Sequence, residues 1–213
     1  MGLQKISFIG VLGNEEDNAV FYLIEEIFFN GGYHIIYEND DGKILFLKSK
    51  EDIQIGLMNI TSETLEAINN LHLKFDLIVH TNLSGKWAEN KYLKEFFSNI
   101  SNLVIFNSDD NNSIELLKGN NKAVIITYGL NNKSTITASS LNIDNMVQFN
   151  YCIQRKIINF FGTVIDGLEF PAKLNFIEEN SVYNGMASIS TGIYYGIPIE
   201  TIKKAIEKVK EVH

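Results

Sequence analysis

The 213-residue sequence has one cysteine, Cys152, and four histidines. A single cysteine excludes an internal disulfide, and its place in an alternating apolar run predicts a buried strand thiol instead of a reactive one. The histidines lack the close spacing of metal ligands, so neither a zinc site nor a histidine catalyst is predicted. The fold must therefore be stabilised by an apolar core, and any chemistry must come from other residue types.

Cationic residues and long apolar runs are also scarce. The 18 Lys and Arg residues are outnumbered by 26 Asp and Glu residues, and the net charge of −8 argues against binding to nucleic acid or to an anionic membrane surface. No run approaches the roughly 18 apolar residues of a membrane span. The first five residues also lack the pattern of a signal peptide. We therefore expect a cytoplasmic protein.

The length and the 45% hydrophobic content suffice for one complete α/β core. Nearly continuous apolar runs predict central parallel strands, because strands buried on both faces need no alternation; these runs begin at Ile6, Phe75, Leu103 and Ala123. Segments with helical periodicity lie between them. The pattern predicts an α/β fold with a mostly parallel sheet flanked by helices.

Other parts of the chain predict antiparallel strands. Turn residues from Asn39 to Gly42 predict a hairpin, and alternating strands from Thr135 to Ile177 predict an appended antiparallel meander. Ser62 is expected to cap a short helix, and Pro198 to open an amphipathic last helix. With no repeat and no low-complexity linker, residues 1–213 are expected to form a single domain.

The first strand and the loop after it have the layout of a phosphate-binding loop. A strand that breaks at Gly10 and Gly13 before a helix suits a phosphate, because loop N–H groups and the helix N-terminus point at it. A working loop also needs a Lys and a Ser or Thr hydroxyl, but Asn14, Glu15 and Glu16 follow Gly13. These acidic residues either complement the helix dipole or mark a nucleotide loop that has lost its chemistry.

Polar loops follow the later central strands, at the sheet edge where open α/β folds bind ligands. Asp109 and Asp110 are either a paired-carboxylate acid/base site or, as we favour, caps of the next helix. Trp87 is either an exposed anchor for an interface or a side chain that fills space in the fold.

Four motifs in these loops and in a late helix occur in one order: Thr81-Asn82-Leu83-Ser84, Asn107-Ser108-Asp109-Asp110, Thr127-Tyr128-Gly129-Leu130 and Val182-Tyr183-Asn184-Gly185-Met186-Ala187. With this order, nearly the whole chain resembles the central, ATPase-like domain of the Mur ligases, which add amino acids to UDP-muramoyl peptides. The UDP-N-acetylmuramoyl-tripeptide synthetase branch is the most similar. The resemblance implies a P-loop-like fold and a stand-alone central domain, with the family's N-terminal UDP-sugar domain and C-terminal ligase domain absent.

The same resemblance implies a degenerate nucleotide site. The family's Gly-Thr-x-Gly-Lys-Thr-Thr loop falls on residues 10–16, so the glycines remain while the lysine and the hydroxyls are replaced. Asn59 falls where the family carries a metal-binding Glu, and residues 86–91 replace its Asp-His-Leu-Asp-x-His segment. The implied vestigial nucleotide site has no catalytic and no metal-binding residue and consists of Gly10, Gly13, Asn14, Glu15, Glu16, Asn82 and Asn184.

These replacements favour a non-catalytic domain, a pseudoenzyme, with a binding or regulatory role related to cell-wall peptide synthesis. We expect no cofactor, and a protein partner or a homo-oligomer, but no nucleic acid and no membrane. The alternative is a divergent ATP-binding amide-bond ligase that uses ATP and Mg²⁺ and is completed by a partner chain. A third hypothesis is a different α/β domain with an accidental resemblance.

Overall fold

Ten strands form one sheet in the computed structural model, which describes residues 6–13, 19–39, 42–83, 87, 90–111, 113–118, 120, 122–177 and 180–210. Their order across the sheet is β12, β9, β8, β7, β6, β5, β1, β4, β3, β2. Their bounds are β1 (Ile6–Leu12), β2 (His34–Glu38), β3 (Ile44–Lys48), β4 (Gln54–Ile60), β5 (Leu77–His80), β6 (Leu103–Asn107), β7 (Val124–Tyr128), β8 (Ile136–Ile143), β9 (Val147–Ile153) and β12 (Leu168–Leu174).

Five parallel strands, β4, β1, β5, β6 and β7, form the middle of the sheet. Every residue of β5 and β6 is buried, as their continuous apolar runs predict. The predicted fold class, a mostly parallel sheet flanked by helices, is therefore confirmed. The carboxyl ends of these strands meet at one edge of the sheet, which is where α/β folds place their ligands.

Antiparallel strands extend the sheet on both sides. The predicted hairpin is formed by β2 and β3 and continues into β4, and the predicted meander is formed by β8, β9 and β12. The meander joins the parallel strands where β7 pairs with β8 through one residue pair, Tyr128 with Ile136. A small hairpin of β10 (Ile157–Ile158) and β11 (Val164–Ile165) interrupts the meander, and the sequence pattern did not indicate it.

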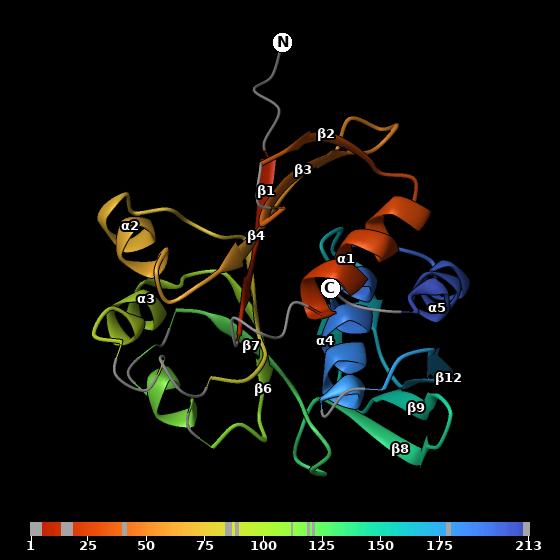
Figure 1. Ribbon diagram of the computed structural model, residues 1–213. Coiled ribbons are helices and arrows are strands. Elements are labelled where there is room, and N and C mark those ends of the chain that lie inside the picture. Colours follow the sequence, from red (N-terminus) through yellow and green to blue (C-terminus); the bar gives the residue numbers. More distant parts are fainter. Residues whose placement is uncertain are drawn as a thin grey trace.

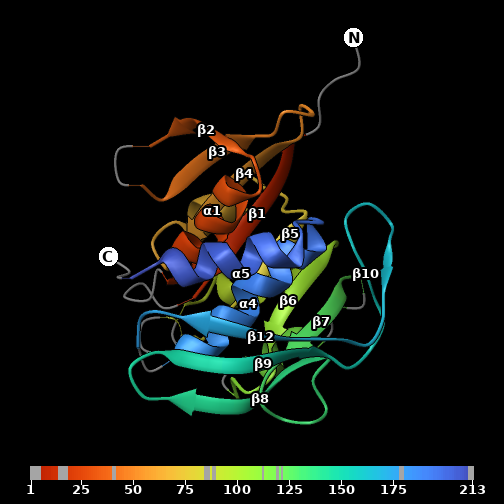
Figure 2. The same ribbon diagram turned by 90° about the vertical axis from the view of Figure 1, so that its right-hand side faces the viewer.

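Helices cover both faces of the sheet (Figures 1 and 2). On one face lie α1 (Ala19–Asn30), α4 (Ser181–Tyr194) and α5 (Ile199–Lys208); on the other lie α2 (Leu65–Asn70), α3 (Leu93–Asn99) and the 3₁₀ helix η2 (Ile114–Leu117). Each face has its own apolar core. No helix within the described ranges is long and apolar enough to cross a bilayer.

The first strand is tied directly to the end of α4. The hydroxyl groups of Ser7 and Tyr195 form a hydrogen bond of 2.8 Å inside the core, across 188 positions of sequence. Helix α1 packs against both α4 and α5. The core on this side of the sheet is thus built from the beginning and the end of the chain together.

Two local predictions are wrong. Helix α2 begins after Thr64 instead of Ser62, because Thr61 and Thr64 satisfy each other: each hydroxyl oxygen accepts a hydrogen bond from the other's backbone N–H, at 3.0 and 3.2 Å. Cys152 lies in strand β9, as expected, but on the half-exposed face of that strand instead of in the core. Partial burial raises the pKa of its thiol, which therefore stays protonated at neutral pH.

Candidate functional site

The loop after β1 begins at Gly13, since β1 continues through Gly10 to Leu12. The prediction that the strand breaks at Gly10 is therefore wrong. A Cβ atom on Gly10 would lie 2.6 Å from the side chain of Ile60 and 2.9 Å from that of Ile78. Gly10 thus serves strand packing. The predicted site residues Asn14, Glu15 and Glu16 lie outside the residues that the structure describes.

Gly13 is held between two side chains from the loop after β5. A Cβ atom there would lie only 2.0 Å from the Thr81 hydroxyl oxygen, so this position requires glycine. The indole N–H of Trp87 also donates a hydrogen bond of 2.8 Å to the Gly13 carbonyl oxygen. The backbone at the start of the loop is fixed by these contacts.

Trp87 is buried, with 2% of its surface exposed. The prediction that it is an exposed interface anchor is therefore wrong, and the alternative, that it fills space in the fold, is confirmed. The sequence did not indicate its hydrogen bond to Gly13, in the loop after β1. An indole offers one N–H donor and no site for a metal ion or for proton transfer at neutral pH.

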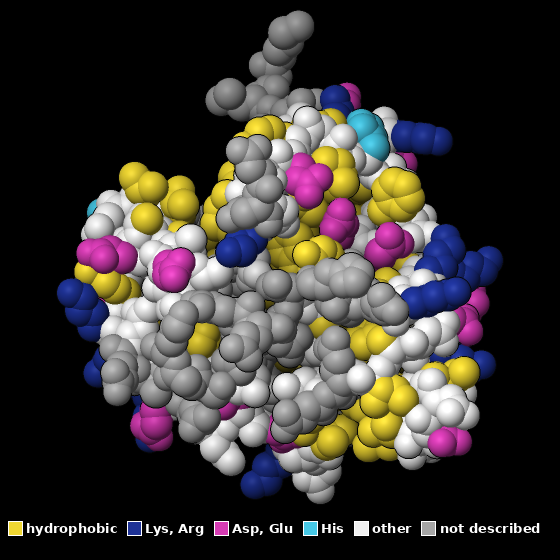
Figure 3. Space-filling view, viewed as in Figure 1, with side chains coloured by type: hydrophobic (Ala, Val, Ile, Leu, Met, Phe, Trp, Pro, Cys, Tyr) yellow, Lys and Arg dark blue, Asp and Glu magenta, His cyan; other side chains and the backbone are white. Residues whose placement is uncertain are grey.

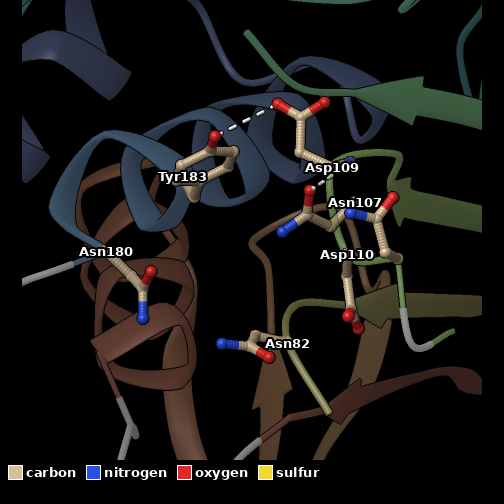
Figure 4. A pocket seen from close by; sticks show the side chains of 7 residues that line it. Asn82, Asn107, Asp109, Asp110, Asn180 and Tyr183 are labelled. Atoms are coloured by element: carbon tan, nitrogen blue, oxygen red, sulfur yellow. Dashed lines mark hydrogen bonds between the residues drawn. The ribbon is translucent and has the colours of Figure 1, made fainter. Parts of the chain in front are cut away.

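A polar pocket of about 360 Å³ lies beside this loop, at the carboxyl ends of β5 and β6 and the start of α4 (Figure 4). In Figure 4 the amide groups of Asn82, Asn107 and Asn180 border the same space. No lysine or arginine is among the described residues that line the pocket, which are Asn82, Asn107, Asp109, Asp110, Asn111, Asn180 and Tyr183.

Asp109 links the β7 loop to α4 across the pocket wall. Its carboxylate accepts hydrogen bonds from the Leu130 N–H at 2.6 Å, from the Asn131 amide and from the Tyr183 hydroxyl at 3.1 Å. Burial and the neighbouring Asp109 raise the pKa of Tyr183 to about 12, so its phenol remains a donor at neutral pH. The prediction that Asp109 caps the following helix is wrong.

Asp110 also links two segments of the chain through its carboxylate, deeper in the protein. Its carboxylate accepts hydrogen bonds from the Leu83 N–H at 3.1 Å and from the Ser113 hydroxyl, and it lies 3.4 Å from Nε2 of His80. Burial acts to raise the pKa of Asp110, but the donors on His80, Ser113 and Leu83 outweigh it and hold the pKa below its usual value. The ionised carboxylate joins the loops after β5 and β6.

His80 is fully buried at the end of β5 and stacks on Phe106, with 4.3 Å between ring centroids. Burial lowers its pKa, so the ring is neutral at physiological pH. Its backbone carbonyl accepts a hydrogen bond of 3.0 Å from the Tyr128 hydroxyl, which binds β5 to β7. Among the residues that the structure describes, no three His, Cys, Asp or Glu side chains are grouped so as to hold a metal ion.

The structure brings together only some of the residues of the vestigial nucleotide site that the sequence suggests. Asn82 lines the polar pocket, while Asn184 is buried within α4 and does not line it. Asn180 and Tyr183, one helical turn apart, line it instead. The sequence signal that could have identified these two residues is their spacing, because residues three positions apart at the start of a helix share a face.

No family model matches the sequence, but individual Mur ligases do. The chain is 23% identical, over 97% of its length, to the UDP-N-acetylmuramoyl-L-alanyl-D-glutamate--2,6-diaminopimelate ligase of Halalkalibacterium halodurans, and 26% identical, over 98%, to the corresponding ligase 1 of Clostridium acetobutylicum. The chain is a homologue of the Mur ligases. The match covers 47% and 46% of these two relatives, so the chain spans about half the length of the curated relatives it matches.

Solved Mur ligases share the fold. The UDP-N-acetylmuramoylalanyl-D-glutamyl-2,6-diaminopimelate--D-alanyl-D-alanyl ligase of Acinetobacter baumannii superposes with a TM-score of 0.70 at 12% identity, over 97% of this chain and 47% of that one. The UDP-N-acetylmuramate-alanine ligase of Thermotoga maritima gives 0.66 at 16% identity, over 99% and 46%. The predicted resemblance to a Mur ligase central domain is confirmed, and the chain corresponds to one domain of these enzymes.

Proposed function

We propose that this Mur ligase homologue is a non-catalytic central domain that acts by binding, in a role related to cell-wall peptide synthesis. The observation that carries the proposal is the hydrogen bond from Trp87 to Gly13. The resemblance aligns Trp87 with a family segment rich in acid and imidazole groups. A buried indole in that place supplies neither a ligand for Mg²⁺ nor a group for proton transfer.

The charges around the site support the same proposal. The sequence from Asn14 to Asp17 has three carboxylates and no lysine or hydroxyl. The nearby pocket contains Asp109 and Asp110, and no cation lines its described wall. Phosphoryl transfer depends on cations that stabilise the negatively charged phosphates. Carboxylates repel phosphates instead. These features disfavour ATP binding and turnover.

The pocket instead suits a ligand with hydroxyl and amide groups. Its asparagine side chains each offer both a donor and an acceptor, and its carboxylates accept further hydrogen bonds. The sugar and the amide bonds of a muramoyl peptide have this chemistry, whereas its free carboxylates and the diphosphate of its UDP carrier do not. We therefore infer that the pocket binds the sugar and amide groups of such a precursor and leaves its charged groups outside.

The test compares three ligands by calorimetry: ATP with Mg²⁺, UDP-N-acetylmuramoyl-L-alanyl-D-glutamate, and the same muramoyl dipeptide without UDP. We expect no heat and no ADP with ATP, and binding of the muramoyl dipeptide that weakens at least about tenfold in Asn82→Ala. Asn142→Ala, which alters an exposed asparagine on β8, is the matched control.

Two outcomes contradict this proposal. Magnesium-dependent ATP turnover that follows the pure protein and is lost in a Gly13→Ala variant would support the alternative, a divergent ligase completed by a partner chain. Absence of muramoyl dipeptide binding, or equal weakening in both asparagine variants, would remove the ligand assigned to the pocket.

A further inference from the structure

Another cavity, of about 540 Å³, lies between α2 and α3 at the amino ends of β5 and β6. This is the edge of the sheet opposite the polar pocket, which lies where the same strands end. We call this cavity the core-end pocket. Its apolar wall consists of four buried side chains of the core beside α2 and α3, namely Ile68, Phe75, Phe96 and Ile100.

Three asparagine side chains fix the walls of the core-end pocket by donating hydrogen bonds to backbone carbonyl groups. Asn69 of α2 donates to the Tyr92 carbonyl, just before α3, at 2.9 Å. Asn102 donates to the Phe75 carbonyl at 2.9 Å and so joins the segments that lead into β6 and β5. Asn120 donates to two carbonyl groups at the end of α3, at 2.6 and 2.9 Å. The cavity is therefore formed without a ligand, as is usual for small-molecule sites.

The end of α2 adds an apolar side chain at the mouth of the pocket. The N–H groups of His72 and Leu73 donate to the carbonyl groups of Asn69 and Ile68, at 3.0 and 3.1 Å, which is the pattern of a Schellman cap. His72 takes the left-handed position of this cap, with a φ of 51°. The turn brings Leu73 to the pocket, where 45% of its surface stays exposed. Figure 3 shows hydrophobic side chains at the surface in the part of the molecule that holds α2.

Two lysine side chains from separate loops line the same pocket. Lys74 lies just before β5 and Lys122 just before β7, on either side of β6 in the sheet. Strands two places apart are about 10 Å apart, so two flexible lysine side chains can both reach a group that lies between them. Both residues are exposed, and neither forms an ion pair with any residue that the structure describes. Their charges are therefore available to an anion.

Two features oppose an anion in the core-end pocket, and both are weaker than the lysines. Glu95 lines the pocket, but one carboxylate against two ammonium groups leaves a net positive charge, with His72 counted as neutral. The carboxyl ends of α2 and α3 carry partial negative charge on their last carbonyl groups. Several of these carbonyl groups already accept hydrogen bonds, from the cap of α2 and from Asn120. In a chain of net charge −8, this pocket is thus locally cationic.

We propose that the core-end pocket binds a small carboxylic acid with a hydrocarbon body. The hydrocarbon lies against the apolar wall, and the ionised carboxylate lies between Lys74 and Lys122. Removal of the hydrocarbon from water supplies most of the affinity, and the ammonium groups supply the preference for an anion. The volume of about 540 Å³ is within the range of ligand pockets, roughly 300–1,000 Å³. The polar pocket, which has asparagines and aspartates and no described cation, suits a different ligand.

Calorimetry of the full chain with octanoate, octanamide and octylamine tests this proposal, because the three ligands share one hydrocarbon tail and differ in charge. We expect octanoate to bind with a dissociation constant below about 1 mM, and octanamide and octylamine to bind at least about tenfold more weakly. Absence of octanoate binding overturns the proposal. Octanamide or octylamine that binds as tightly as octanoate overturns it as well, because the lysines would then not select the ligand.

N-acetyl-leucine separates a small acid from the carboxyl end of a peptide, which offers the same charged group. Its short side chain fills less of the apolar wall, so it should bind at least about tenfold more weakly than octanoate. Tighter binding of N-acetyl-leucine would assign the pocket to a peptide end and overturn the proposal.

Substitutions of exposed charges locate the binding. Lys74→Gln/Lys122→Gln should weaken octanoate at least about tenfold and leave octanamide unchanged. Lys173→Gln/Lys204→Gln is the matched control, because it removes two exposed lysines from β12 and α5 and changes the net charge equally. Equal weakening of octanoate binding in the two double variants overturns the proposal.

Glu95→Gln gives an effect of the opposite sign. It removes the carboxylate that opposes the ligand, so it should strengthen octanoate binding by about threefold. Weaker binding in this variant contradicts the proposed place of the carboxylate. Circular dichroism establishes that each variant is folded. The ligands contain no sugar and no phosphate, and the pocket lies at the other edge of the sheet, so the result is independent of the function proposed above.

Discussion

The indole N–H of Trp87 is bonded to the carbonyl oxygen of Gly13, a residue 74 positions earlier in the chain. This contact joins the loop after β5 to the loop after β1, at the edge of the sheet where the parallel strands end. Gly13, at the start of one loop, and Trp87, in the other, are thus held together. The first three predictions concern the residues that hold the loops at this edge.

Trp87→Phe should destabilise the protein by about 1–3 kcal/mol, because it leaves the Gly13 carbonyl without its partner while keeping an aromatic ring. Trp87→Ala should cost about 3–5 kcal/mol, because it also leaves a cavity. Urea unfolding followed by circular dichroism measures both, since Trp87 is the only tryptophan and fluorescence is lost. Equal stabilities of Trp87→Phe and the unaltered chain would show that the hydrogen bond contributes nothing.

Gly13→Ala should cost about 1–3 kcal/mol through overpacking, since its Cβ atom would overlap the Thr81 hydroxyl. Thr81→Ala removes that hydroxyl, so the double variant Gly13→Ala/Thr81→Ala should regain most of the loss. A double-mutant cycle on unfolding free energies measures the coupling. Additive effects of the two substitutions would contradict the contact that the structure shows.

Stability should fall as the pH decreases from about 7.5 to about 5 because of His80. The pKa of this buried ring is lowered from its usual 6.5, so the unfolded chain takes up a proton more readily than the folded one. The contribution of His80 to the free energy of unfolding is fully present above pH 6.5. It is lost as the pH falls through 6.5 toward the lowered pKa of the folded state. Asp110, whose pKa is also lowered, adds a loss only at more acidic pH, below its usual 3.8.

Melting temperatures of the unaltered chain and of His80→Gln test this pH dependence. Glutamine does not titrate, so the variant should lose much less stability over the same pH range. His34→Gln replaces an exposed histidine and serves as the control. If His80→Gln and the unaltered chain share one pH profile, the acid sensitivity does not come from His80.

Replacement of Asn14 by Lys and of Glu15 and Glu16 by Thr should restore measurable nucleotide affinity. A lysine would replace an amide, and two hydroxyl groups would replace two carboxylates, in the segment before α1, whose N-terminus attracts phosphate. No turnover should appear, because the resemblance places Trp87 at a family imidazole and Asn59 at the family's metal-binding Glu, and neither side chain replaces those groups. Calorimetry with ATP and Mg²⁺ is the measurement. A folded triple variant that binds no nucleotide would show that the charges of residues 14–16 are not what prevents nucleotide binding.

The fold was predictable because the apolar patterns of the strands are local. Continuous runs in β5 and β6 indicate burial on both faces, and alternation in β9 and β12 indicates one buried face. The β10–β11 hairpin was missed because each of its strands has two residues, too few to show a period. Cys152 was misplaced because the period of a strand does not say which of its two faces meets the core.

The site was harder to predict because its contacts join residues far apart in sequence. Asp109 and Asp110 look like one pair, yet the first binds Tyr183 and the second lies beside His80. Only the order of strands in the sheet brings these partners together. Trp87 likewise gave no local sign of its bond to Gly13, since a lone tryptophan in a polar segment is equally typical of a surface.

The hydrogen bond between Ser7 and Tyr195 also bears on folding during synthesis, because the ribosome makes the two residues 188 positions apart. Strand β1 and helix α1 emerge from the ribosome well before α4, which contacts α1 and completes its core. Until then the buried side of α1, with Leu23, Ile24 and Ile27, has no covering helix. The nascent chain must keep this apolar surface from premature association while the strands between α1 and α4 are made, as expected for a topology of high contact order.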